Sequence, residues 1–461
     1  MPNHSLPPSA IFKAYDIRGI VGTTLTTAGT EAIGHAIGSE AIDRGVSSVV
    51  IGRDGRLSGP DLSAALARGL QASGVNVIDV GMVATPMLYF AAHALESFSG
   101  VMVTGSHNPP AYNGLKMMLA GDTLSGDVIQ VLRTRLVQQQ LHHGAGQYSE
   151  HDIRPAYLER IVQSIHLARP MHIAVDSGNG IAGATAPELY RQLGCTVDEL
   201  FCEVDGTFPN HHPDPSQPDN LRDLIHQLAL GKAELGLAFD GDGDRLGVVT
   251  PSGRIIYPDR QLMLFAEEVL SRHPGAEIIF DVKCTRHLFS WIRNRGGIPL
   301  MWKTGHSFIK QKLKQTGAPL AGEMSGHIFF KDRWYGFDDG IYAGARLLEI
   351  LSRSANPGAI LEALPEAVST PELQWELSEG ENYSLMNTLQ SNAKFPTAQE
   401  IITIDGLRVE YADGFGLARP SNTTPIIVLR FEADNQAALE RIQADFRVAL
   451  IALKPGATLP F

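Results

Sequence analysis

A faint internal repeat runs through the first three quarters of the chain and limits the folds that it can adopt. Each copy alternates apolar strands with helical segments and ends in a polar loop. Strands that alternate with helices form mostly parallel sheets covered on both faces, so the repeat predicts three similar α/β domains. Such sheets bind ligands where their strands end in loops, which places the three end-loops at one cleft. The copies open at residues 49–51, 173–175 and 278–280 and end in the loops that contain Ser106, Asp240 and Glu323.

The last segment of the chain does not follow the repeat. Residues 408–411 and 426–431 have the pattern of antiparallel strands on either side of a glycine-containing turn. An amphipathic helix is predicted from Asn435 to about Ala452, because apolar side chains recur on one face. These side chains are Leu439, Ile442, Phe446 and Leu450. We therefore expect a small C-terminal α+β domain.

A chain of 461 residues is too long for a single hydrophobic core. Turn and linker signals predict four domains, at residues 1–151, 152–254, 255–366 and 367–461. The expected fold class is α/β, with mixed, mostly parallel sheets in domains I to III around a central active-site cleft. Domain IV is expected to be a lid that closes on substrate about a hinge near Pro365.

Composition narrows the range of partners. A hydrophobic content of 44% and a charged content of 19% are typical of globular proteins, and the net charge of −12 argues against nucleic acid or an anionic membrane as a partner. Residues 1–11 lack a signal-peptide pattern and no apolar run spans a bilayer, so we expect a cytoplasmic protein. The three cysteines, Cys195, Cys202 and Cys284, are predicted to fill core positions. The histidine pairs at 142–143 and 211–212 are predicted to lie in solvated loops.

Ser106 lies in a tight polar loop, Thr104-Gly105-Ser106-His107-Asn108-Pro109, directly after the apolar strand at 101–103. A serine beside asparagine and proline is commonly a turn or capping residue. The alternative is a nucleophile or the carrier of a transferable group. The nucleophile loop of the α/β hydrolases is excluded, because Asn108 stands where that motif requires its second glycine.

Three aspartates stand at alternate positions in Asp240-Gly241-Asp242-Gly243-Asp244-Arg245, after the apolar strand at 235–239. The intervening glycines let the three carboxylates converge on one hard cation, for which Mg²⁺ is the best candidate. A calcium-binding EF-hand loop is excluded, because Arg245 and Pro251 stand where it requires glycine and glutamate. A carboxylate-bound metal ion that faces a serine loop indicates phosphoryl chemistry.

Two further loops carry groups that suit a sugar phosphate. In Gly322-Glu323-Met324-Ser325-Gly326-His327, the acceptor Glu323 and the hydroxyl of Ser325 suit neighbouring sugar hydroxyls, although an ordinary surface turn accounts for them equally well. The second loop is Arg419-Pro420-Ser421-Asn422-Thr423-Thr424-Pro425. Its guanidinium group and short polar side chains suit a phosphate dianion.

These four loops, in this order, resemble the signature loops of the α-D-phosphohexomutases, and the bacterial phosphomannomutase/phosphoglucomutase branch is the most similar. The resemblance extends from Phe12 to the C-terminus. It implies a reversible transfer of phosphate between O1 and O6 of glucose and mannose phosphates, through a phosphoserine at Ser106 and a 1,6-bisphosphate intermediate. It also implies a Mg²⁺ ion bound by Asp240, Asp242, Asp244 and an oxygen of the phosphoserine.

The resemblance assigns roles to further residues. Glu323 and Ser325 hold the sugar O3 and O4, and the loop of Arg419, Ser421, Asn422 and Thr423 binds the phosphate that is not transferred. The other implied residues are the cations Lys116 and Arg245 beside the phosphoserine and the N-terminal Tyr15 and Arg18. His306 and His327 are candidate acids or bases because histidine titrates near neutrality, although a lone histidine is more often structural. Lys116 is a further acid or base candidate, and Lys283 a candidate phosphate contact.

Contacts to O3 and O4 alone do not distinguish the two configurations at C2, so glucose and mannose phosphates would both fit. A phosphoglucosamine mutase remains an alternative, as do a metal-dependent sugar phosphatase and a catalytically silent sugar-phosphate sensor. The expected partners are small hexose phosphates, with glucose 1,6-bisphosphate as activator. The protein is expected to act as a monomer.

Overall fold

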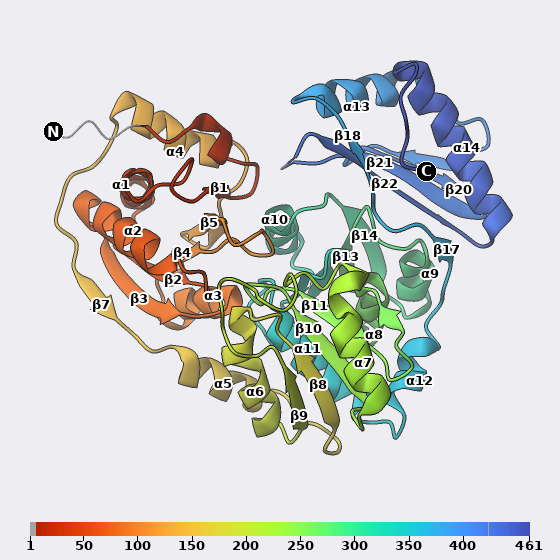
Figure 1. Ribbon diagram of the computed structural model, residues 1–461, viewed down its shortest axis with the longest axis horizontal. Coiled ribbons are helices and arrows are strands. Elements are labelled where there is room, and N and C mark those ends of the chain that lie inside the picture. Colours follow the sequence, from red (N-terminus) through yellow and green to blue (C-terminus); the bar gives the residue numbers. More distant parts are fainter. Residues whose placement is uncertain (1–5, 423) are drawn as a thin grey trace.

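The computed structural model describes residues 6–422 and 424–461, which form four units around a common centre (Figure 1). Domain I lies on the left of that view, domains II and III form the base, and domain IV lies at the upper right. Three α/β units are followed by a C-terminal unit with an antiparallel sheet, so the predicted fold class is confirmed. Within the described part of the chain, no helix combines the length and the apolar character needed to cross a bilayer.

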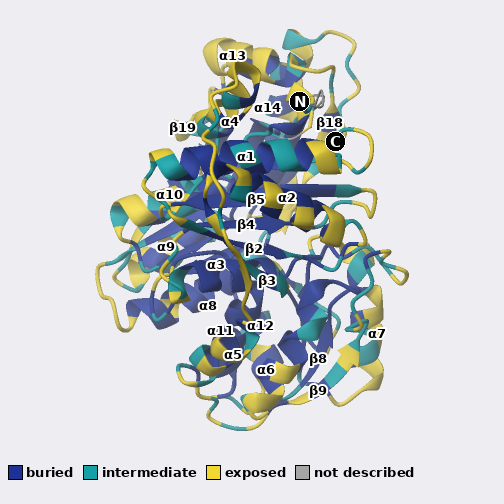
Figure 2. Ribbon diagram, turned by 90° about the vertical axis from the view of Figure 1, so that its left-hand side faces the viewer, coloured by how far each residue is buried: buried dark blue, intermediate teal, exposed yellow. Residues whose placement is uncertain are grey.

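Domain I is a mixed sheet covered by helices. Its strands follow the order β1-β5-β4-β2-β3-β7, with β6 beside β5, and β2 pairs in parallel with β3 and β4 whereas β5 runs antiparallel to β4. The central strands β5, β4 and β2 are mostly buried, and helices α1 and α2 lie over the sheet (Figure 2). The elements are η1 (Ser9–Ile11), β1 (Ile17–Ile20), α1 (Thr27–Asp43), β2 (Ser48–Arg53), α2 (Gly59–Ser73), β3 (Asn76–Met82), α3 (Thr85–Ala94), β4 (Gly100–Val103), β5 (Tyr112–Leu119), β6 (Asp122–Thr123), α4 (Asp127–Gln138) and β7 (Tyr148–Glu150).

Domain II contains a smaller sheet of the order β12-β11-β10-β8-β9. Strand β8 is parallel to β9 and β10, and β11 is antiparallel to β10. The elements are α5 (Arg154–Val162), β8 (His172–Asp176), η2 (Ile181–Ala184), α6 (Ala186–Gln192), β9 (Thr196–Leu200), η3 (Pro218–Leu221), α7 (Arg222–Leu230), β10 (Leu235–Phe239), β11 (Leu246–Val249) and β12 (Ile255–Ile256).

Domain III contains a sheet of the order β14-β13-β15-β16. Strand β13 is parallel to β14 and β15, and β16 is antiparallel to β15. The elements are α8 (Pro258–Leu270), β13 (Glu277–Asp281), α9 (His287–Asn294), β14 (Ile298–Trp302), α10 (His306–Thr316), β15 (Leu320–Gly322), β16 (Ile328–Phe330), α11 (Gly340–Leu351) and α12 (Pro357–Glu362).

The three repeated sheets place their polar loops at equivalent positions. In each sheet, a strand that is parallel to the centre of the sheet is followed by an antiparallel neighbour: β4 by β5, β10 by β11 and β15 by β16. The loops that join these pairs contain Ser106, Asp240 and Glu323, respectively. The predicted repeat therefore has a counterpart in sheet topology.

Domain IV is an antiparallel sheet packed against two helices. Its strands follow the order β17-β22-β21-β20-β19, with β18 also beside β22. Helix α14 begins after Asn435, whose side chain accepts a hydrogen bond from the Ala438 N–H, and its four predicted core residues are buried. The elements are β17 (Val368–Ser369), β18 (Leu373–Glu376), α13 (Glu381–Asn392), β19 (Glu400–Ile402), β20 (Leu407–Tyr411), β21 (Gly414–Pro420), β22 (Ile426–Ala433) and α14 (Gln436–Leu453).

The apolar core is divided unevenly among the domains. One cluster runs through domains I, II and III, whereas most of the apolar core of domain IV forms a cluster of its own. Cys195 and Cys284 are buried and Cys202 is half-buried, which confirms that the cysteines pack in the interior.

Arg346 on α11 holds a buried ion network in domain III. Its side chain is fully buried and lies 2.6 Å from Glu268 Oε2 and 3.0 Å from Asp332 Oδ2. Replacing Arg346 with methionine leaves two half-compensated carboxylates in the interior, so we expect the free energy of unfolding to fall by about 3–5 kcal/mol. The measurement is urea denaturation, followed at the first unfolding transition.

The control for that variant is Arg222→Met. Arg222 forms an exposed ion pair with Asp219, at 2.5 Å, on the first turn of α7. Exposed pairs contribute at most about 1 kcal/mol, so this change is expected to be small. Equal losses in the two variants would contradict the role of the buried network.

Candidate active site

The serine loop of domain I and the aspartate loop of domain II meet at one point. Ser106 Oγ lies 3.1 Å from Asp240 Oδ2, and both residues are buried. A Cβ atom at Gly241 would lie 2.4 Å from the carbonyl oxygen of Ser106, so only glycine permits this approach. The structure therefore brings together the two loops on which the predicted phosphoryl chemistry depends.

The three aspartates form a compact group of carboxylates. Asp240, Asp242 and Asp244 are fully buried, and one oxygen of each lies within 4.8 Å of the others. Burial and the charges of the two neighbouring carboxylates raise the pKa of Asp240 well above its usual range. The negative charge of Asp240 is therefore not fully compensated by nearby cations.

Lys116, on β5, supplies part of the compensating positive charge. Its Nζ atom lies 2.8 Å from Asp242 and 2.5 Å from Asp244. Burial alone would lower the pKa of Lys116, but these two carboxylates raise it well above its usual range. The lysine is therefore protonated and compensates the charge of the two aspartates next to the serine loop.

The aspartate group fits a divalent metal ion. Asp242 Oδ1 is buried and has no hydrogen-bond partner among the described residues. A donor set of carboxylate oxygens is the one that hard cations prefer. Asp240, Asp242 and Asp244 are thus able to hold such an ion next to Ser106.

His327 links the aspartate loop to the loop of domain III. Its Nε2 atom lies 3.2 Å from Asp244 Oδ1 and 3.3 Å from Arg245 Nε, and its Nδ1 atom lies 3.1 Å from Glu323 Oε2. Burial and Arg245 would lower the pKa of His327, but Asp244 and Glu323 raise it to about 9. Without a metal ion at Asp244, the two carboxylates thus favour the protonated form of this imidazole.

The pKa of His306 is shifted in the opposite direction to that of His327. It opens helix α10, and its Nδ1 atom lies 3.7 Å from Asp338 Oδ2. Burial, together with Lys310 and Lys116, lowers the pKa of His306 well below its usual range. The rings of His306 and His327 are 5.6 Å apart, so two imidazoles whose pKa values are shifted in opposite directions lie side by side. Paired groups whose pKa values are driven apart are suited to accept and to donate protons.

The predicted sugar-binding residues lie beside these histidines. Glu323 Oε1 accepts a hydrogen bond of 2.5 Å from the Gly305 N–H, and Ser325 Oγ lies 3.0 Å from His327 Nδ1. Glu323 is buried. Both residues thus belong to the same group as the histidines and are not part of an isolated surface turn.

The predicted phosphate loop of domain IV lies at the other end of the site. Arg419 is buried and donates from Nε to Asp405 Oδ2 at 3.0 Å. Ser421 Oγ accepts from Thr424 Oγ1 at 2.9 Å, and Asn422 donates to the hydroxyl of Tyr15. Thr423, which was also predicted for this loop, lies outside the described residues.

The remaining predicted residues connect the domains around the site. Tyr15 donates to the carbonyl of Thr304 at 3.2 Å, so the N-terminal segment touches domains III and IV at once. Arg18 donates to Asp16, and its other amino group reaches the side chain of Asn108 in the serine loop.

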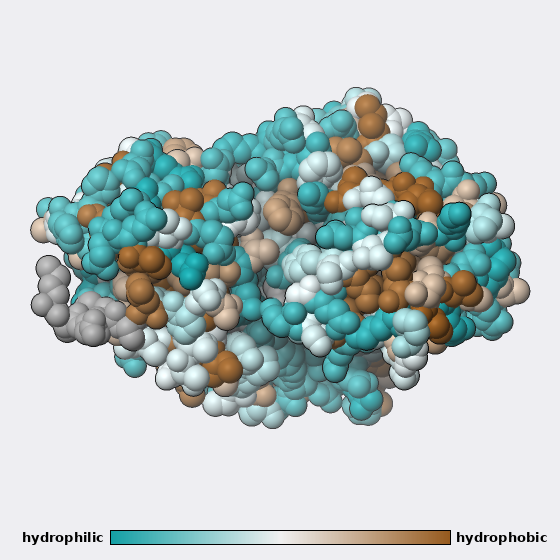
Figure 3. Space-filling model, turned by 90° about the horizontal axis from the view of Figure 1, so that it is seen from above, coloured by the Kyte–Doolittle hydropathy of each residue, from teal (hydrophilic) through white to brown (hydrophobic). Residues whose placement is uncertain are grey.

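Lys283 follows β13 and lies 2.6 Å from Glu372, at the boundary between domains III and IV. From above, the surface is hollowed between domain I on the left and domain IV on the right (Figure 3).

Comparison with known protein families agrees with this arrangement. Four family models match the chain in order: phosphoglucomutase/phosphomannomutase alpha/beta/alpha domain I over residues 9–142, domain II over 155–253, domain III over 257–368, and the C-terminal domain over 372–449. The chain belongs to the phosphoglucomutase/phosphomannomutase family. The resemblance to the α-D-phosphohexomutases is thereby confirmed.

Relatives of this family are similar over nearly the whole chain. A phosphoglucomutase of Neisseria meningitidis is 61% identical over 98% of each chain, and a phosphomannomutase/phosphoglucomutase of Pseudomonas aeruginosa is 56% identical over 98% of each. A crystal structure of a phosphoglucomutase/phosphomannomutase family protein from Burkholderia thailandensis has a TM-score of 0.95 at 61% identity, over 99% of this chain and 100% of that one.

The predicted solvent exposure is wrong for one histidine pair of this phosphoglucomutase/phosphomannomutase family member. His211 and His212 are half-buried: His211 Nε2 lies 3.1 Å from both oxygens of Asp176, and His212 Nε2 donates to the carbonyl of His107 in the serine loop. The prediction of a solvated loop is wrong for this pair, because domain I packs against it. The exposed pair His142 and His143 agrees with the prediction.

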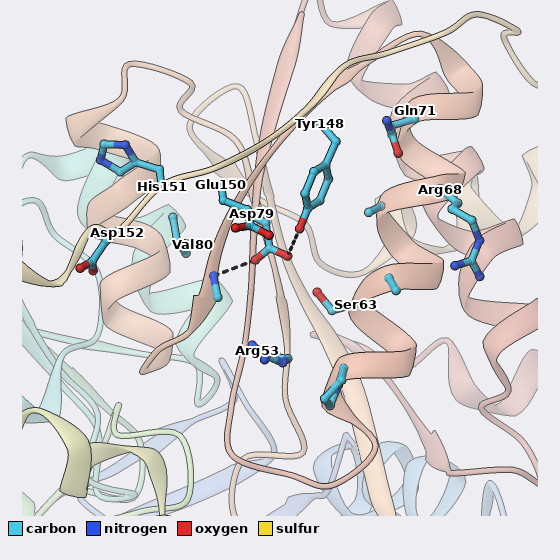
Figure 4. A pocket seen from close by; sticks show the side chains of 14 residues that line it. Arg53, Ser63, Arg68, Gln71, Asp79, Val80, Tyr148, Glu150, His151 and Asp152 are labelled. Carbon is cyan, nitrogen blue, oxygen red and sulfur yellow. Dashed lines mark hydrogen bonds between the residues drawn. The ribbon is translucent and has the colours of Figure 1, made fainter.

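Two cavities lie outside the group of catalytic candidates. One, of about 710 Å³, lies on domain I between α2, β3 and β7, where Tyr148 donates to Asp79 at 2.9 Å (Figure 4). None of the predicted site residues lines it. A second, of about 440 Å³, lies between the N-terminal segment and domain IV and is lined in part by Ser421 and Asn422. The second cavity therefore adjoins the candidate phosphate loop.

Proposed function

We propose that this protein interconverts the 1-phosphates and 6-phosphates of glucose and mannose, with Ser106 as the carrier of the phosphoryl group. The observation that carries the proposal is the 3.1 Å distance between Ser106 Oγ and the aspartate group. The names of the relatives, phosphoglucomutase and phosphomannomutase/phosphoglucomutase, support the substrate class.

The reaction consists of two transfers of the same kind. The bond between phosphorus and Ser106 Oγ breaks as a free sugar hydroxyl attacks, and the hydroxyl proton passes to a base. The resulting 1,6-bisphosphate turns over in the site, and Ser106 Oγ then takes the other phosphoryl group while a proton returns to the sugar oxygen. Glucose 1,6-bisphosphate added from outside would phosphorylate Ser106 and so act as an activator.

The charges in the site suit such transfers. A Mg²⁺ ion held by Asp240, Asp242, Asp244 and a phosphoserine oxygen would neutralise the oxygens of the moving group. Arg245 faces the same space and steadies their charge. His306, whose pKa is lowered, is suited to accept the hydroxyl proton, and His327, whose pKa is raised, is suited to return it.

Substrate recognition divides between two ends of the site. Glu323 and Ser325 would hold O3 and O4, and the loop of Arg419 would bind the phosphate that is not transferred, with Lys283 nearby. Tyr15 and Arg18 would line the substrate site on the side of domain I. Since none of these contacts reads C2, glucose and mannose phosphates are both accommodated.

A side-by-side assay tests the proposal. Glucose 1-phosphate and mannose 1-phosphate are each expected to yield the 6-phosphate, and glucosamine 1-phosphate is expected to react more slowly. Faster conversion of the glucosamine phosphate would identify a phosphoglucosamine mutase. Steady release of inorganic phosphate would identify a phosphatase, and binding without conversion would identify a sensor.

Replacing Arg419 with alanine is expected to raise KM for glucose 1-phosphate by about tenfold to a hundredfold and to slow turnover. The reason is the loss of charge-assisted hydrogen bonds to the phosphate that is not transferred. Steady-state kinetics measure the effect. The control is Arg441→Ala in the same domain, because Arg441 pairs with Asp413 at 2.5 Å outside the site. Unchanged kinetics in the Arg419 variant would contradict the role of this loop.

A further inference from the structure

A buried arginine that the predicted mechanism does not use lies directly beneath the serine loop. Arg56 follows β2, and its guanidinium group donates to four backbone carbonyls of the loop between β4 and β5. Nη2 lies 2.8 Å from Ser106 O and 2.6 Å from Asn108 O, and Nη1 lies 2.7 Å from Pro109 O and 2.9 Å from Tyr112 O. One side chain thus binds the loop from Ser106 to the start of β5.

The geometry of this contact is specific to arginine. The two amino groups of a guanidinium carry four N–H bonds in one plane, and four carbonyls receive them. The remaining nitrogen, Nε, lies 3.3 Å from Asp54 Oδ2. A lysine at position 56 would keep the charge but has only three donors at a single point, so it is unable to bind the same four carbonyls.

Asp54 holds the other side of the loop. Its Oδ2 atom accepts from Thr104 Oγ1 at 2.7 Å and from the Gly105 N–H at 3.2 Å. Asp54 therefore binds the loop before Ser106, and Arg56 binds the carbonyls of Ser106 and the residues after it.

The loop needs such support because Ser106 adopts an unfavourable backbone conformation. Its φ angle is +48°, in the left-handed region that residues other than glycine seldom occupy. A hydrogen bond from the Ser106 N–H to Thr104 Oγ1, at 2.8 Å, supports this conformation from within the loop, and Arg56 adds contacts from outside it. The guanidinium group of Arg56 binds the carbonyl of Ser106 itself.

Gly105 is adapted to the arginine. A Cβ atom at position 105 would lie 2.4 Å from both Cζ and Nε of Arg56, so the guanidinium plane packs directly on the glycine. The φ angle of Gly105 is not in the left-handed region, so the backbone conformation itself does not require glycine here.

Domain II covers the other side of Arg56. The Cζ atom lies 5.1 Å from the centre of the Phe208 ring, and a Cβ atom at Gly206 would lie 2.7 Å from the Arg56 Cα atom. The domain that supplies the three aspartates therefore packs on the residue that holds the serine loop.

We propose that Arg56 is the positioning residue that fixes the backbone of the serine loop, and so places Ser106 Oγ against the aspartate group. The inference rests on the proposed function for its kinetic consequence. Among the described residues, Arg56 forms no hydrogen bond or ion pair with Asp240, Asp242 or Asp244, so its effect on the site passes through the loop. A displacement of about 1 Å at a reacting group lowers turnover by about a hundredfold.

The test compares Arg56→Lys with Arg346→Lys, a buried arginine of domain III that lies outside the site. Hydrogen–deuterium exchange of residues 104–112 is measured for each folded protein, together with kcat and KM for glucose 1-phosphate. In Arg56→Lys we expect faster exchange in this loop, a fall in kcat of about 30- to 100-fold and a KM within threefold of the original. In Arg346→Lys the loop and kcat should be unchanged.

A second variant keeps the proposal testable if Arg56→Lys does not fold. Gly105→Ala pushes the guanidinium group away and should also speed exchange and lower kcat. In the double variant Arg56→Lys with Gly105→Ala, the two effects should be less than additive, because the clash partner is gone.

Different results would overturn the positioning role of Arg56 and the proposed mutase activity. Unchanged exchange and unchanged kcat in both Arg56→Lys and Gly105→Ala would overturn the positioning role while leaving the mutase proposal intact. Equal losses in Arg56→Lys and Arg346→Lys would also overturn it. If the original protein converts no hexose phosphate, the proposed function falls, and loop exchange alone decides the role of Arg56.

Discussion

Replacement of Ser106 by alanine is expected to lower mutase turnover by about a thousandfold or more. The variant lacks the oxygen that gives up one phosphoryl group and takes back the other, and no described hydroxyl replaces it at the 3.1 Å position beside Asp240. Turnover is measured by coupling the formation of glucose 6-phosphate to its oxidation. The variant should still bind glucose 1-phosphate, because the groups at Glu323 and Arg419 remain.

The control for this experiment is Ser325→Ala. Ser325 belongs to the proposed sugar contact, so its loss should raise KM and leave the covalent step in place. Phosphopeptide mapping after incubation with labelled glucose 1,6-bisphosphate should find the label at Ser106 in the original protein and in Ser325→Ala. A fully active Ser106→Ala variant, with the label on another residue, would refute the carrier role.

Removal of one carboxylate from the aspartate group is the second change with a large expected effect. Asp240→Asn is expected to lower kcat by about a thousandfold, because the site then holds a divalent ion more weakly beside Ser106. Chelation with EDTA should inactivate the original protein, and Mg²⁺ should restore it. The control is Asp219→Asn, an exposed aspartate on η3.

The thermal stability of Asp240→Asn in the absence of metal gives a second test. The neighbouring carboxylates and burial disfavour the charge on Asp240, as its raised pKa indicates. Asp240→Asn should therefore melt at the same or a higher temperature than the original protein when both are free of metal. Added Mg²⁺ should stabilise the original protein by about 2.7 kcal/mol at a hundredfold excess over its Kd, and the variant by less at the same concentration. Equal Mg²⁺ stabilisation of both proteins would contradict the assignment of the ligands.

Local sequence patterns predicted the elements of the fold well. The apolar strands before Ser106 and Asp240 are β4 and β10, and the predicted C-terminal helix is α14, with its four apolar residues buried. These predictions succeed because strand ends and amphipathic faces depend on neighbouring residues. The shared cleft was also predictable, since equivalent loops of similar sheets lie at equivalent edges.

Contacts between domains were beyond local patterns. No local pattern indicates that the amino group of Lys116 pairs with Asp242 and Asp244, which lie more than a hundred residues away. The support of the serine loop by Arg56 was missed for a similar reason. Its carbonyl partners are backbone groups, which no side-chain motif identifies.

The equivalent position of the three loops bears on how such a protein acquires new specificities. Each loop joins two strands of its own sheet, so an exchange of side chains in one loop leaves the hydrogen-bonded ladders of the other two intact. Under the proposed function, substitutions of Glu323 and Ser325 in the turn after β15 would alter sugar recognition, whereas the carrier serine and the metal ligands lie in the turns after β4 and β10. Sheets of similar topology thus allow the sugar contacts to vary while the phosphoryl carrier and its carboxylates are kept, provided that His327 is retained.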